Sequence, residues 1–107
     1  MIYINAKNFF KKQDQRVLKA IENAFHTREH ITLDLSIAQI VVEPFRYQER
    51  TYLRLLSLQS QPDLNQEALF KTVWSHLLDF VKILNEIFAW DHDIELAIIS
   101  TSAFPGI

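Results

Sequence analysis

The chain has 107 residues, of which 49% are hydrophobic, and its formal net charge at pH 7 is −2. It contains no Cys, one Gly and three Pro. This composition excludes a disulfide framework, a thiolate metal site, a cysteine nucleophile and a glycine-rich phosphate-binding loop. A chain of this length buries roughly 60–70% of its unfolded surface, which is enough for one core. We expect a single domain over residues 1–107, with residues 100–107 as a flexible tail.

The first part of the chain predicts a short strand followed by an amphipathic helix. Ile2, Tyr3 and Ile4 are the strand candidate. Over residues 8–26, apolar side chains recur near every 3.6 residues, which is typical of a helix with one buried face. Asn8 is the expected N-cap, since its side chain can accept a hydrogen bond from a free backbone amide. Three basic side chains share the opposite face: Lys12, Arg16 and Lys19.

Two alternating segments in the middle of the chain predict a β-hairpin. Residues 31–43 and 50–58 alternate between apolar and polar side chains, as half-buried strands do. In both strands the apolar residues change from one face to the other at one point. When Glu43 is paired with Arg50, these two points lie opposite each other, which supports this register. A bulge near Ala38 is the alternative, because one extra residue would return the apolar side chains to one face.

A long helix and a last strand complete the predicted elements. The helix has two competing N-caps, Asp63 and Asn65, and runs to about Trp90. Its apolar arc is wider than one sheet can cover. The first helix or a second copy of the chain must therefore cover the remainder. The alternating residues 94–100 follow as the last strand.

The resulting order of elements, β-α-β-β-α-β, predicts an α+β fold of the ferredoxin-like type. This fold is a two-layer sandwich, in which an antiparallel sheet carries two helices on one face. It hosts many unrelated functions, so functional expectations come from particular residues rather than from the fold.

The apolar segments do not predict a membrane protein. The N-terminus lacks the basic region and the long apolar run of a signal peptide. Residues 68–90, the most apolar stretch, carry charged side chains that a membrane span would exclude. We expect a cytoplasmic protein.

One short motif matches a metal-site pattern. In the segment from His26 to His30, two His flank a Glu with the spacing of the inverted zinc-peptidase motif. Two His four residues apart on one helical face can bind a metal ion, and the Glu would activate water. The segment also lies where the first helix should end, and His and Arg stabilise a helix C-terminus. We expect no catalytic residue, metal or cofactor, and a small metal-dependent hydrolase is the most distant alternative.

Charge is distributed unevenly along the chain. Residues 1–28 hold six basic and two acidic residues, whereas residues 29–107 hold five basic and eleven acidic ones. The basic face formed by Lys12, Arg16 and Lys19 would make weak, salt-sensitive contacts with phosphates. A nucleic-acid-binding regulator that uses this helix is therefore the alternative function, although a solvated basic face is the commoner structure.

The predicted hairpin tip is the strongest site signal. Turns prefer Gly, Asn and Asp, whereas this tip contains Phe45, Arg46 and Tyr47, residue types that are enriched at interface hot spots. Ile40 and Leu53 lie beside it on the adjoining strands. The alternative is a tip that folds back onto the domain.

Four acidic residues near the end of the long helix add a second expected contact surface: Asp79, Glu86, Asp91 and Asp93. Charge complementarity would speed association with a basic partner. We expect a non-catalytic protein-protein interaction module of the inhibitor, immunity-protein or antitoxin type. It would bind and neutralise another protein, such as a basic toxin or nuclease, and a homodimer is also expected.

Overall fold

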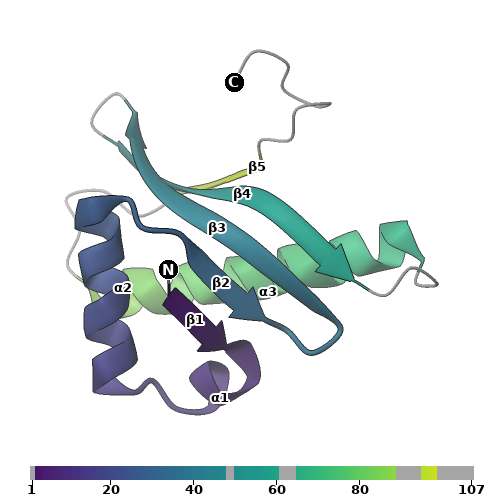
Figure 1. The fold of residues 1–107 in the computed structure, drawn as a ribbon, viewed down its shortest axis with the longest axis horizontal. Coiled ribbons are helices and arrows are strands. Elements are labelled where there is room, and N and C mark those ends of the chain that lie inside the picture. Colours follow the sequence, from purple (N-terminus) through teal and green to yellow (C-terminus); the bar gives the residue numbers. More distant parts are fainter. Residues whose placement is uncertain (1, 48–49, 61–64, 89–94, 99–107) are drawn as a thin grey trace.

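The computed structural model describes residues 2–47, 50–60, 65–88 and 95–98 (Figure 1). The chain forms an α+β fold, as predicted. The elements in chain order are β1 (Ile2–Asn5), α1 (Ala6–Lys11), α2 (Gln15–Thr27), β2 (Ile31–Asp34), β3 (Ala38–Tyr47), β4 (Arg50–Ser60), α3 (Gln66–Ile87) and β5 (Glu95–Ile98). The predicted tail at residues 100–107 lies outside the described residues.

The five strands form one mixed sheet in the order β1-β2-β3-β4-β5. The pairs β1–β2 and β4–β5 are parallel, and the two central pairings are antiparallel. The prediction of an antiparallel sheet is therefore wrong, and the ferredoxin-like order is not confirmed. In a split βαβ unit another strand separates the two parallel strands, whereas here the members of each parallel pair are direct neighbours.

The sheet differs from the prediction because residues 31–43 form two strands rather than one. Between β2 and β3 the chain reverses at Ser36, which has a left-handed backbone with a φ of 71°. The Ser36 amide donates a hydrogen bond to Oδ1 of Asp34 at 2.9 Å, and the Leu35 amide donates to the Ala38 carbonyl at 2.8 Å. Asp and Ser stabilise turns through such bonds. The turn contains no Gly or Pro. The alternation of apolar and polar residues therefore continues through it, and the sequence gives no sign that one strand ends and another begins.

The β3–β4 hairpin is displaced from the predicted register. Glu43 pairs with Arg54 rather than with Arg50, and the hairpin closes where Tyr47 pairs with Arg50. The pairing shifts between Val41 and Val42, which lie opposite Ser57 and Leu55, so the extra residue is Leu56 of β4. A bulge of this kind changes which alternate residues face the core. Leu55 and Leu58 consequently both pack against the core.

The predicted first helix is also divided into two. The Asn5 side chain caps α1 by accepting a hydrogen bond from the Asn8 amide at 3.1 Å. The Asp14 side chain caps α2 by accepting one from the Arg16 amide at 2.7 Å. The prediction that Asn8 is an N-cap is therefore wrong. The break at residues 12–14 lets each short helix direct its own apolar face at the core.

The long helix α3 begins at the second of its two predicted caps. The Asn65 side chain accepts a hydrogen bond from the Ala68 amide at 3.0 Å, and the helix ends at Ile87. Although α3 has 22 residues, no helix in the described part of the chain is long and apolar enough to cross a membrane.

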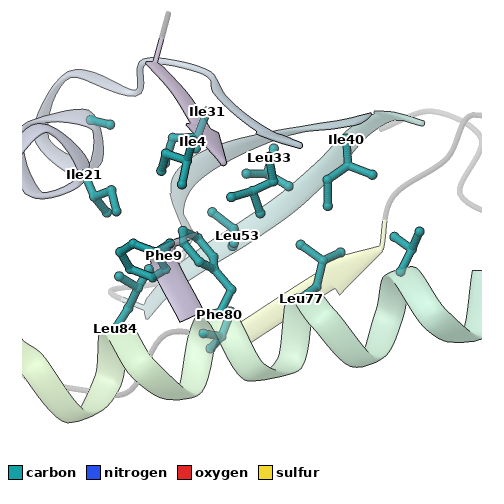
Figure 2. Close-up of a cluster of buried hydrophobic side chains, with 14 of the residues drawn as sticks. Ile4, Phe9, Ile21, Ile31, Leu33, Ile40, Leu53, Leu77, Phe80 and Leu84 are labelled. Atoms are coloured by element: carbon teal, nitrogen blue, oxygen red, sulfur yellow. The ribbon is translucent and has the colours of Figure 1, made fainter. Parts of the chain in front are cut away.

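All three helices pack against one face of the sheet around a single core. Figure 2 shows Leu77 and Phe80 of α3 directed towards the sheet, where Ile40 and Leu53 meet them. The rings of Phe9 and Phe80 lie 5.4 Å apart between their centroids, so α1 and α3 meet in the same core. The result is a two-layer arrangement with one helix layer and one sheet.

The burial of Ile40 predicts that its truncation destabilises the fold more than truncation of the exposed Ile37 does. Ile40 is fully buried, whereas Ile37, in the turn three residues earlier, is 44% exposed. Ile40→Ala should lower the free energy of unfolding by about 2–5 kcal/mol, because it leaves a cavity in the core. Ile37→Ala should lower it by less than about 1 kcal/mol. Urea unfolding followed by circular dichroism measures both values, and equal losses would contradict the observed placement of β3.

Candidate functional site

The sheet has a second face, which we call the open face, and none of the described helices lies in front of it (Figure 1). Successive side chains of a strand point to opposite faces, so the neighbours of the buried Val42 and Leu53 point to the open face. Two cross-strand pairs of β3 and β4 lie there next to each other: Glu43 with Arg54, and Phe45 with Tyr52.

An aromatic pair lies near the end of the hairpin on the open face. The rings of Phe45 and Tyr52 stack with centroids 5.1 Å apart and an interplanar angle of 20°. The guanidinium carbon of Arg54 lies 5.2 Å from the centre of the Phe45 ring. Cross-strand aromatic pairs and cation–π contacts each stabilise such a surface. Phe45 is therefore held against the sheet rather than projecting from the tip.

Beside this stack, four polar side chains form what we call the Glu43 cluster: Arg28, His30, Glu43 and Arg54. Oε1 of Glu43 accepts hydrogen bonds from Nη2 of Arg54 at 2.5 Å and from Nη2 of Arg28 at 3.3 Å. Nε2 of His30 lies 3.1 Å from Oε2 of the same carboxylate. Arg28 ends α2 in a left-handed conformation with a φ of 58°, which turns the chain towards β2.

The Glu43 cluster favours an ionised carboxylate. Burial raises the pKa of Glu43, but the hydrogen bonds from Arg54 and His30 and the charges of Arg54 and Arg28 outweigh this effect and hold the pKa below its ordinary value. Two guanidinium groups surround one carboxylate, so the cluster carries excess positive charge. The buried Nε of Arg54 finds no hydrogen-bond acceptor among the described residues.

At the other end of the open face, Tyr3 of β1 joins Asp34 of β2. The Tyr3 hydroxyl donates a hydrogen bond to Oδ2 of Asp34. This bond and the one from the Ser36 amide lower the pKa of Asp34. The same contact raises the pKa of the Tyr3 hydroxyl. The arrangement links the edge strand β1 to the turn that follows β2.

The predicted contact residues fall in different parts of the fold. Phe45 lies on the open face, whereas Ile40 and Leu53 are fully buried in the core and have no surface to offer a partner. The side chains of Arg46 and Tyr47 lie outside the described part of the structure.

The predicted acidic surface is separate from the hairpin. Asp79 and Glu86 are exposed on α3, in the helix layer, and therefore lie on the other side of the sheet from Phe45. Asp91 and Asp93 lie outside the described residues. The structure consequently does not bring Asp79 and Glu86 together with Phe45.

Sequence reasoning did not identify Tyr52, Arg54 or the Glu43 cluster as a site. The correct register of the β3–β4 hairpin is the information that identifies these residues as neighbours. With Glu43 opposite Arg54, the next two residues towards the tip bring Phe45 opposite Tyr52. The predicted register paired Glu43 with Arg50, and in that register Phe45 and Tyr52 are not opposite each other.

The geometry of the His26–His30 segment does not match the zinc-peptidase motif. The helix α2 ends at Thr27, so the two His do not share a helical face. His26 lies in the last turn of α2, while His30 leaves the helix and contacts Glu43. No group of three or more His, Asp or Glu side chains that could hold a metal ion occurs within the described ranges.

The three residues of the predicted basic face are all exposed. Arg16 and Lys19 lie one turn apart on α2, and Lys12 follows the end of α1. The break between the helices therefore places Lys12 on a separate segment from the other two.

The Glu43 cluster predicts a specific dependence of stability on pH. Because its folded-state pKa lies below the ordinary value of 4.5, Glu43 stabilises the protein above that pH and loses this contribution as the pH falls through the lowered pKa. The difference in unfolding free energy between the wild type and Glu43→Gln should therefore be large at pH 7 and shrink below about pH 4.5. Arg54→Gln should reduce this dependence, because it removes the strongest partner. A difference in unfolding free energy between the wild type and Glu43→Gln that stays the same at every pH would contradict the predicted role of Glu43.

Comparison with known proteins identifies no relative of this chain. No family model, no curated protein and no solved structure matches it. Similarity therefore assigns neither a family nor an activity, and inference about function depends on the surfaces of the chain itself.

Proposed function

We propose that the chain is a non-catalytic protein-binding module whose contact surface is the open face around Phe45, Tyr52 and Arg54. The observation that carries this proposal is the stack of two aromatic rings and a guanidinium on a sheet face that no described helix covers. Tyr, Phe and Arg are enriched at the centres of protein interfaces, where each provides a large contact area.

The contacts within the site support binding with little reorganisation. Cross-strand pairing holds Phe45 and Tyr52 in position, and Glu43 holds Arg54. A surface that is already ordered loses less side-chain entropy when a partner binds. The side chain of Arg28 is 58% exposed, and with the excess positive charge of the cluster it suits a carboxylate on the partner.

The finer role that we propose is that of a small inhibitor or immunity-type protein. Such a protein neutralises its target, for example a toxin or a nuclease, by covering a functional surface, and this requires a rigid contact face rather than chemistry. The described acidic residues that suggested a basic target, Asp79 and Glu86, lie in the helix layer. The excess positive charge of the Glu43 cluster instead favours a target that presents carboxylates to the open face, because charge complementarity accelerates association.

Site-specific photo-crosslinking tests the proposed contact surface. A photoreactive amino acid that replaces Tyr52, introduced in cells that naturally produce the chain, should give one adduct of defined mass, because Tyr52 lies in the contact face. Adding Arg28→Glu should reduce the adduct at least severalfold, because it reverses an exposed charge of the site. The photoreactive residue at Lys19, exposed on α2, is the control. No adduct at position 52, or equal adducts at both positions, would contradict the proposal.

A nucleic-acid-binding regulator remains the second candidate, supported by the exposure of Lys12, Arg16 and Lys19. If all three contact phosphates, the logarithm of the binding constant for mixed-sequence RNA should fall with the logarithm of salt concentration with a slope of about −2. Fluorescence anisotropy at increasing salt measures this slope. Replacing the three residues with Glu should abolish binding, and absence of wild-type binding at low salt would rule out this candidate.

A further inference from the structure

Large apolar side chains remain exposed on one flank of α3. Phe70 is 40% exposed and Leu78 is 47% exposed. Trp74 lies between them and stacks on Phe70, with ring centroids 6.4 Å apart and an interplanar angle of 8°. The spacing of four residues places the three side chains along one side of the helix. We call them the α3 stripe.

The α3 stripe faces away from the first helix. His76 stacks on Phe10 of α1, with ring centroids 5.8 Å apart. At about 100° per residue, His76 points almost opposite to Trp74. The helix α1, which forms the first part of the predicted first helix, therefore does not cover the stripe. Adjoining exposed apolar side chains of this kind are available for contact with another protein.

We infer that a second copy of this chain covers the α3 stripe, packed antiparallel along α3 about a two-fold axis near Leu78. A two-fold interface is self-complementary, so any residue that contacts another in the partner copy receives the reciprocal contact. This surface is distinct from the open face, and the inference is independent of the proposed function.

The charges beside the stripe support a second copy as the occupant. Lys71 lies seven residues before Leu78, and Glu86 lies eight residues after it. With a rise of about 1.5 Å per residue, both are about 11 Å from the axis, in opposite directions along the helix. An antiparallel copy therefore brings Lys71 level with the partner's Glu86, and this opposite-charge pair forms twice in the dimer.

The directions of these side chains fit the same arrangement. Around the helix axis, Lys71 and Glu86 lie about 20° and 80° from Leu78, both on the same side of it. The two-fold axis is perpendicular to the plane that contains the two antiparallel helices. Side chains on one side of Leu78 therefore meet side chains from the same side of Leu78 in the second copy. Lys71 and Glu86 thus approach one another, whereas Phe70 and Trp74 lie on the opposite side of Leu78, away from these charges.

Existing contacts leave both charges able to reach a partner. Nζ of Lys71 lies 3.6 Å from Oε1 of Glu67, but the two side chains are 76% and 82% exposed, and such a surface pair contributes little. Lys82, the other basic residue of α3, falls level with the uncharged Ser75 of the second copy. Asp79 lies about one residue from the axis, so the two copies of Asp79 come nearly level. Each lies about 100° around the helix from Leu78 and therefore at the edge of the contact between the two helices.

Light scattering after size-exclusion chromatography of the full chain, over a range of concentrations, tests the inference. The mass should approach twice 12.6 kDa as the concentration rises. Lys71→Glu and Glu86→Lys should each weaken self-association about tenfold, because each variant sets like charges against one another twice in the dimer. Leu78→Lys should prevent it, because it buries a charge at the axis.

Mixing the two charge variants provides the decisive measurement. In a mixed dimer of Lys71→Glu with Glu86→Lys, both pairs are again complementary, so an equimolar mixture should regain wild-type affinity. Lys19→Glu on α2 is the matched control and should leave self-association unchanged, and circular dichroism verifies that every variant is folded.

Three outcomes would overturn the inference: a monomer at all concentrations, a dimer that both charge variants leave unchanged, or a mixture that does not regain affinity. None of them affects the proposed function, because the crosslinking at position 52 concerns the other side of the sheet.

Discussion

The pairing of β3 with β4 is the constraint on which the rest of the structure depends. With Glu43 opposite Arg54, Val42 and Leu53 face the helices while Phe45 and Tyr52 face away from them. A slip of one residue would exchange the two faces of a strand. The bulge at Leu56 compensates for the change of pattern in β4, so apolar residues on both sides of it reach the core. One register thus determines both the core and the open face.

The Glu43 carboxylate joins elements that are far apart in the chain. It connects Arg28 at the end of α2, His30 before β2 and Arg54 on β4. A largely buried carboxylate needs such partners, because an uncompensated buried charge is strongly destabilising. The same contacts hold Arg54 over the Phe45 ring. The stability of the hairpin and the rigidity of the proposed binding surface therefore have a common physical origin.

The two-layer architecture explains why α3 has two kinds of apolar surface. A sheet on one side covers only a stripe of a helix. Leu77, Phe80 and Leu84 occupy that stripe and are fully buried. Phe70 and Leu78 fall outside it and stay exposed. The open face and the α3 stripe thus lie in different layers, so the proposed partner protein and the proposed second copy would not compete for one surface.

Local sequence pattern determined the α+β class and the long helix, and it limited the N-cap of that helix to Asp63 or Asn65, because periodicity and capping depend on residues only a few positions apart. The division of residues 31–43 into two strands depended on a turn at Ser36 that contains neither Gly nor Pro. The hairpin register was ambiguous for a similar reason. Arg50 and Arg54 can both pair with Glu43, and their spacing of four residues preserves the alternation. Only packing of the sheet on the helices selects between them, because it decides which side chains are buried together. Tertiary structure therefore decided which residues form the candidate site.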